Sequence, residues 1–149
     1  MSGMQDNQVA AGPAVGGRRH RFLGLVGVGL LATIVAMTVT TLGAALAKAA
    51  GVSFEIAGGS ETIPVGGFAT LTGFFSVVGV VIAVALLRWS ARPAERFVWT
   101  AGSLTALSLV PPLLAGADAA TAVVLLVLHL VAAAVVIPTL ARSLRGRSG

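Results

Sequence analysis

One long apolar stretch, Ala119 to Ala141 (AATAVVLLVLHLVAAAVVIPTLA), constrains the fold more than any other part of the chain. Its one titratable side chain is His129, near the centre of the stretch. A membrane with a hydrocarbon core of about 30 Å is crossed by roughly 20 apolar residues of α-helix. Because backbone polar groups in lipid must be satisfied within the segment, this stretch predicts a membrane-spanning helix.

Three further stretches have the same character, and 56% of the 149 residues are hydrophobic. The mean hydropathy of +0.97 lies well above that of soluble domains, whose surfaces must be polar. The predicted fold is therefore an all-α membrane protein, a bundle of four transmembrane helices at about residues 22–47, 68–87, 97–114 and 119–141. A cleaved signal peptide is the alternative for the first stretch, but its apolar part exceeds the usual ~7 to 15 residues.

The basic residues predict which way the helices cross. Nine of the ten lie before the first stretch, between the second and third, or after the fourth, and only Lys48 lies on the other side. This positive-inside pattern places both termini in the cytoplasm. The high ratio of Arg to Lys is typical of GC-rich genomes and suggests a bacterial cytoplasmic membrane. Arginines beside spans are expected to contact anionic lipid headgroups, and we expect no nucleic-acid partner.

The polar parts of the sequence complete the predicted organisation. Residues 1–17 lack periodicity and predict a disordered cytoplasmic tail, residues 18–145 form the transmembrane domain, and residues 146–149 form a short basic tail. Between the first two helices, apolar and polar residues alternate on both sides of Gly58-Gly59-Ser60, which predicts a short extracytoplasmic β-hairpin over residues 50–66. Asp118 stands where it would cap the fourth helix.

Small residues line one face of each of the first two predicted helices, and the third carries Thr105 and Ser108 on one side. Small side chains let helix backbones approach closely, which is how helices associate where lipid removes the hydrophobic drive. The steps of three and four residues predict that the first two helices pack on each other through these faces. The candidate helix-contact residues are Gly29, Ala36, Gly43, Ser76, Gly79, Thr105 and Ser108.

The sequence contains no recognisable catalytic constellation. It has no cysteine, no nucleotide-binding glycine motif, no His-Glu metal cluster and no close pair of carboxylates within a span. We expect no enzyme activity, no catalytic residue, no metal and no cofactor. The one candidate functional residue inside the membrane is His129. Its predicted role is a neutral, structural hydrogen bond to Ser76, Thr105 or Ser108, and the alternative is a titrating relay or ligand group.

The segment VLLVLHLVAAAVVIPTLAR resembles a family of uncharacterised four-helix bacterial membrane proteins that is catalogued as a domain of unknown function. The resemblance covers about Arg19 to Arg145. It is carried by His129, the Ala/Val run that ends in Ile137-Pro138, and Trp99. It implies four spans, but no activity, substrate or catalytic residue.

Two functions from different classes remain. The first is a non-catalytic structural or interaction subunit, whose partner is the same chain in a homo-oligomer or another membrane protein. The second is a small oligomeric transporter or channel that uses His129. The first is favoured because four short spans with few polar groups offer little to coordinate a solute.

Overall fold

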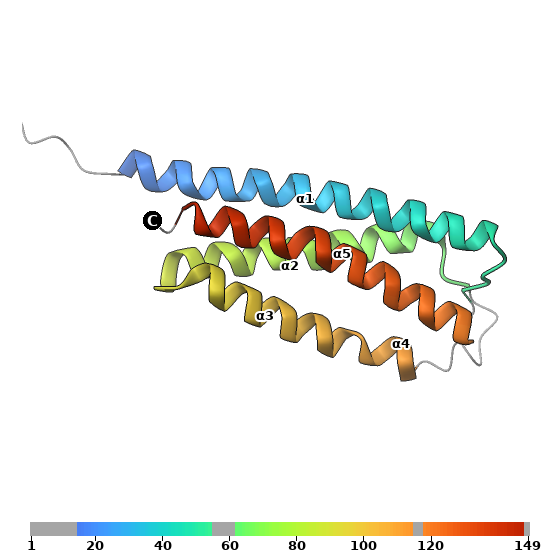
Figure 1. Ribbon diagram of the computed structural model, residues 1–149. Helices are drawn as coiled ribbons and strands as arrows, with labels where there is room; N and C mark the ends of the chain where they lie inside the picture. The colour runs from blue at the N-terminus through green and yellow to red at the C-terminus, as the bar shows by residue number, and fades with distance from the viewer. Residues whose placement is uncertain (1–14, 55–61, 115–117, 148–149) are drawn as a thin grey trace, which may run out of the picture.

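The computed structural model describes residues 15–54, 62–114 and 118–147, and all regular elements in these ranges are helices (Figure 1). They are α1 (Val15–Ala49), α2 (Val65–Trp89), α3 (Pro93–Ser108), α4 (Val110–Leu114) and α5 (Ala119–Arg145). The predicted all-helical architecture is confirmed. Most of the predicted tail, residues 1–14, lies outside the described residues.

Three of these helices are long and apolar enough to cross a membrane: α1, α2 and α5. With 25 residues, α2 is about 38 Å long at 1.5 Å per residue, which exceeds the ~30 Å of a hydrocarbon core. The 16 residues of α3 give only about 24 Å.

The segment predicted as a third continuous helix, residues 97–114, is divided into α3 and α4 by a turn at Leu109. Two prolines that follow the turn explain the division. Pro111 and Pro112 have no N–H, so the carbonyls of Leu107 and Ser108 cannot receive their usual helical donors. Instead, the N–H of Leu109 reaches back to the carbonyls of Ala106 and Leu107 and closes α3.

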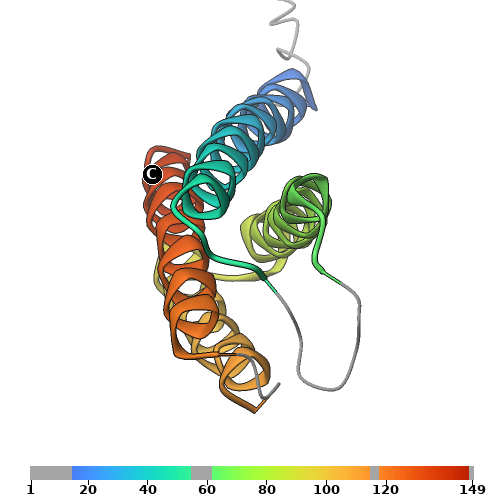
Figure 2. The same cartoon turned by 90° about the vertical axis from the view of Figure 1, so that its right-hand side faces the viewer.

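Helix α1 is the shared partner in the bundle. It packs along α2 and along α5, and these two contacts are the most extensive between helices (Figure 2). Helices α3 and α4 lie against α5, and α3 also touches α2. The main buried cluster lies where α1, α2, α3 and α5 meet, and it includes Leu25, Val80, Phe97 and Leu140.

The predicted β-hairpin over residues 50–66 is wrong for the part of that range that the structure describes, which contains no β-strand. Among the described residues of this loop, a backbone hydrogen bond from the N–H of Ile63 to the carbonyl of Phe54 (3.2 Å) joins the two sides. Phe54 has a φ of +54°, outside the extended region, and its side chain is 1% exposed. The ring centroids of Phe54 and Phe68, on α2, are 5.0 Å apart. Burial of the Phe54 ring, and not pairing of two strands, therefore holds this loop against the helices.

The chain enters and leaves the bundle at the same end (Figure 1). This end, which we call the arginine end, contains the start of α1, the end of α2, the connection to α3 and the start of α3, and the end of α5 with the residues after it. Nine arginines belong to these segments: Arg18, Arg19, Arg21, Arg88, Arg92, Arg96, Arg142, Arg145 and Arg147. Lys48 is in the last turn of α1, at the opposite end.

Candidate functional site

His129 lies on α5 and is joined to α3 by a hydrogen bond. Its Nε2 is 2.7 Å from the Oγ of Ser108, the last residue of α3. The same Oγ donates to the carbonyl of Thr105 at 2.8 Å, so the hydroxyl accepts its second hydrogen bond from the imidazole N–H. Of the three hydroxyl residues predicted as partners, Ser108 is the one within hydrogen-bond distance.

The position of Ser108 depends on the break after α3. Its hydroxyl can turn to the carbonyl of Thr105, one turn back, while its own carbonyl has lost the helical donor that Pro112 cannot supply. Both Ser108 and His129 are partly buried. The pair therefore connects a helix end to the middle of α5 and leaves part of the imidazole open to the surroundings of the bundle.

The other candidate helix-contact residues divide between two interfaces, not the one predicted between α1 and α2. A Cβ added to Gly29 would lie 2.5 Å from Val80 on α2 and 3.4 Å from Leu140 on α5. A Cβ added to Gly43 would lie 2.6 Å from Leu128 on α5. Gly43 thus makes room for α5.

The remaining predicted contacts are less tight or lie elsewhere. Ala36 is fully buried, and Ser76 is 6% exposed within α2. A Cβ on Gly79 would reach only a 4.0 Å contact with Val136 on α5. Thr105 contributes its backbone carbonyl to the Ser108 hydroxyl.

Helices α1 and α2 are joined by a pair of hydroxyls. The Oγ1 atoms of Thr40 and Thr72 are 3.1 Å apart, and Thr40 also donates to the Ala36 carbonyl at 2.8 Å. A second close approach, which sequence reasoning missed, is at Gly73, where an added Cβ would lie 3.0 Å from the sulfur of Met37. Gly67, Gly73 and Gly79 follow one another at steps of six residues. Such steps do not place residues on one face of a helix, so the sequence pattern did not identify Gly73 as a contact.

Asp118 caps α5 as predicted. Its Oδ1 accepts the backbone N–H of Thr121 at 2.9 Å, and its Oδ2 accepts the Thr121 hydroxyl at 2.8 Å. The backbone hydrogen bond, followed by the hydroxyl, holds the pKa of the Asp118 carboxyl below its ordinary value. Glu55 and Glu61, the other acidic residues of the predicted outer side, lie outside the described residues.

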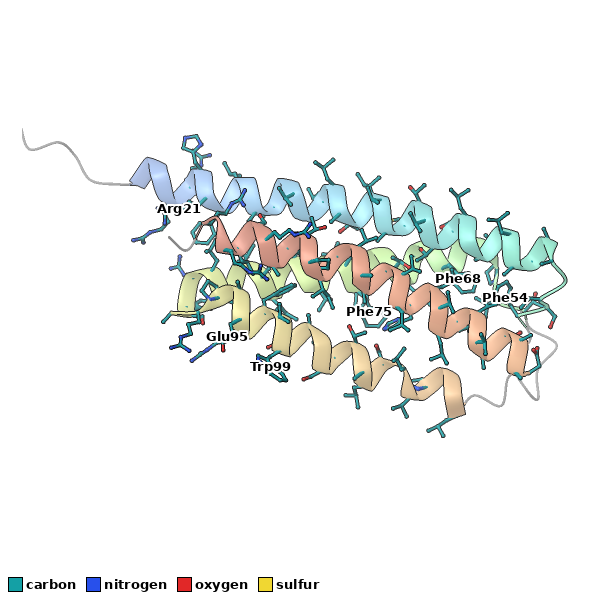
Figure 3. All side chains as sticks on the ribbon, viewed as in Figure 1. Arg21, Phe54, Phe68, Phe75, Glu95 and Trp99 are labelled. Atoms are coloured by element: carbon teal, nitrogen blue, oxygen red, sulfur yellow. The ribbon has the colours of Figure 1, made fainter. Side chains whose placement is uncertain are left out.

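At the arginine end, Arg147 makes a specific contact, although the sequence indicated only its positive charge. Arg147 donates from Nε to the carbonyl of Arg21 (3.0 Å) and from Nη1 to the carbonyl and hydroxyl of Ser143. A Cβ on Gly24 would lie 2.6 Å from Nη2 of Arg147, so the absence of a side chain there admits the guanidinium. Figure 3 shows Arg21 and Glu95 at this end on different helices.

No group of three His, Cys, Asp or Glu side chains that could hold a metal occurs among the residues that the structure describes. Interior hydroxyls bond either across helices, as Thr40 does to Thr72, or back to a carbonyl of their own helix, as Thr33 does to Gly29 (2.9 Å). Thr41 is an exception, since its buried Oγ1 has no hydrogen-bond partner within the described part of the chain.

Comparison with known proteins places the chain in a family. The model of one family, described as a family of unknown function (DUF6069), matches residues 20–146. No curated protein and no solved structure matches the chain. The matched range agrees with the resemblance inferred over about Arg19 to Arg145. Because the match spans most of the sequence, the chain belongs to this family of unknown function.

Proposed function

We propose that this chain is a multi-pass protein of the bacterial cytoplasmic membrane that acts as a non-catalytic structural or interaction subunit. The observation that supports it is the 2.7 Å hydrogen bond between Ser108 and His129. Through this bond the imidazole of His129, the most polar side chain within the apolar helices, holds α3 against α5. A subunit of this kind presents lipid-compatible helix surfaces to a partner and keeps its polar groups for its own assembly.

The proposal includes a fourth membrane crossing, made by α3 and α4 together. Residues 93–114 correspond to about 33 Å at 1.5 Å per residue, enough for a hydrocarbon core of about 30 Å. The turn at Leu109 then lies within the crossing, and the Ser108–His129 pair holds it to α5. Irregular backbone at membrane depth is tolerated where protein covers it.

The orientation is tested by single cysteines, since the natural chain contains none. Ser53 and Ala91 are both exposed and lie at opposite ends of the bundle. With the arginine end in the cytoplasm, Ser53→Cys reacts with an impermeant thiol reagent outside intact cells, and Ala91→Cys reacts only after lysis. The reverse pattern of labelling overturns the orientation.

The subunit role is tested by purification in mild detergent, followed by measurement of mass and composition. A stoichiometric protein partner, or a discrete homo-oligomer that conducts no ions in vesicles, supports the role. The partial exposure of His129 favours transport as the second candidate, because an imidazole at an oligomer contact would reach solvent or solute. If His129→Asn folds like the native protein but abolishes a pH-dependent flux in reconstituted vesicles, transport replaces the structural role.

A further inference from the structure

A cavity of about 430 Å³ opens at the arginine end, between the start of α1, the end of α2 and the second residue after α5. Four arginines line it: Arg18 and Arg21 from α1, Arg88 from α2, and Arg147. The remaining lining side chains are apolar or aromatic, namely Phe22, Leu87 and Trp89.

Within the described part of the chain, no carboxylate lines this cavity. Among the described residues, Glu95 is the one acidic residue of the arginine end, and it lines a separate cavity with Arg92. Its Oε2 is 3.6 Å from Nη1 of Arg92. Four positive charges therefore share a small space with no counter-charge from the described part of the chain, and an anion in this space would offset their repulsion.

Two of the guanidinium groups are held by neutral acceptors. Arg147 donates to the carbonyls of Arg21 and Ser143, at 3.0 and 2.9 Å, and Nη1 of Arg21 donates to the carbonyl of Arg147 at 3.1 Å. Carbonyl oxygens fix the side chains without cancelling their charge. The planar guanidinium keeps further N–H donors, in a fork that matches the oxygens of a phosphate group.

The apolar part of the lining indicates more than a free ion. Phe22 and Leu87 stand at the boundary between the apolar helices and the arginines, where a lipid headgroup joins its acyl chains. Trp89 is 77% exposed beside them, and its ring centroid is 5.8 Å from the guanidinium carbon of Arg88. Exposed tryptophans favour this depth of the membrane.

We propose that this cavity binds the headgroup phosphate of an anionic phospholipid, with Arg18, Arg21, Arg88 and Arg147 as its ligands and an acyl chain along Phe22 and Leu87. The inference rests on the membrane placement of the chain, but not on its role as a structural subunit. Inorganic phosphate shares the headgroup's charge and lacks the acyl chain, so the two sources can be separated.

The test uses Trp89 as the reporter in a Trp99→Phe background, because the chain contains two tryptophans. The purified protein in detergent is titrated with phosphatidylglycerol whose acyl chains are brominated, which quenches nearby indole fluorescence. Brominated phosphatidylcholine is the neutral comparison. We expect phosphatidylglycerol to quench Trp89 at lower concentration, and millimolar inorganic phosphate to leave that quenching in place.

Two matched pairs of variants distinguish a specific lipid site from a general attraction of anionic lipid to positive charge. Arg18→Gln/Arg88→Gln removes two ligands, and Arg19→Gln/Arg142→Gln removes the same charge from exposed positions outside the cavity. We expect the first pair to weaken phosphatidylglycerol binding by about tenfold or more relative to the second, as each arginine near a phosphate contributes several-fold. Equal weakening by both pairs, or displacement of the lipid by inorganic phosphate, overturns the proposal.

A third variant keeps the net charge. In Gly24→Ala, the new Cβ would lie 2.6 Å from Nη2 of Arg147 and so displace that guanidinium from its place beside α1. Weaker lipid binding with unchanged helicity supports the site. Binding equal to that of the native protein shows that the lipid does not need the Arg147 guanidinium in its place beside Gly24, which contradicts the site as described.

Discussion

Arg21 and Arg147, which are 126 positions apart in the sequence, each donate a side-chain hydrogen bond to the backbone carbonyl of the other. The exchange joins the first turns of α1 to the residues that follow α5. It closes the bundle at the end where the chain both enters and leaves.

Loss of this connection should be measurable. We expect Arg147→Gln to reduce the free energy of unfolding by about 1 to 2 kcal/mol, toward the lower end for charged hydrogen bonds because the groups are partly exposed. Arg142→Gln is the control, since it removes the same charge from an exposed site on α5. Thermal unfolding in detergent checks the difference, and equal midpoints for the two variants would contradict it.

The pair formed by Ser108 and His129 predicts energetic coupling. Hydrogen bonds between membrane helices contribute about 0.6 to 2 kcal/mol. In a double-mutant cycle with Ser108→Ala and His129→Leu, we expect a coupling energy in that range. His129→Asn retains a donor and should preserve part of the stability that His129→Leu loses. Strictly additive effects of the two single changes would show that the bond contributes nothing.

Two glycines of α1 provide a matched test of close packing. A Cβ on Gly29 would lie 2.5 Å from Val80, whereas one on Gly27 would meet nothing within 4 Å. We expect Gly29→Ala to destabilise the bundle by about 1 to 3 kcal/mol through overpacking. Gly27→Ala should be neutral or stabilise α1 by up to about 1 kcal/mol, since alanine favours helix. Unfolding of both variants in the same detergent distinguishes them, and the same midpoint for both would refute the predicted contact.

The cap at Asp118 predicts a dependence on acid. The pKa of its carboxyl is lowered from an ordinary 3.8 in the folded chain, so its contribution to stability is complete above the unfolded pKa. That contribution disappears as the pH falls through the folded pKa, below 3.8. Asp118→Asn keeps a capping side chain but does not titrate there. The stability difference between native and variant proteins should therefore shrink as the pH falls from about 5 to below 3.8, and a constant difference would exclude the carboxylate.

Helix positions followed directly from the sequence because each apolar run must satisfy its own backbone in lipid. The helices extend a few residues beyond those runs, as α5 does in reaching Arg145, since helical hydrogen bonding continues past the apolar boundary. The loop before α2 was harder to predict. The alternation around Phe54 satisfies a strand pattern, but burial of one ring against Phe68 requires long-range packing that no local pattern records.

The candidate site, like the fold, could be predicted from the sequence only in part. The depth of His129 and the set of three hydroxyl partners could be derived from residue spacing, but the choice of Ser108 depends on the turn at Leu109. The faces of α1 were harder to separate. Gly29 and Gly43 share one line of small residues, yet Gly43 opens toward α5, because a helix with neighbours on two sides distributes its small residues between them.

The position of α1 between α2 and α5 also fixes an order of assembly during synthesis. The ribosome releases α1 and α2 early, so their contact at Thr40 and Thr72 can form while the rest of the chain is still being made. The close approach at Gly43 must wait for Leu128 on α5, which follows α1 to α4 in the sequence. Until α5 has been made, this side of α1 lacks its Leu128 neighbour, so the contact of α1 with α5 follows its contact with α2.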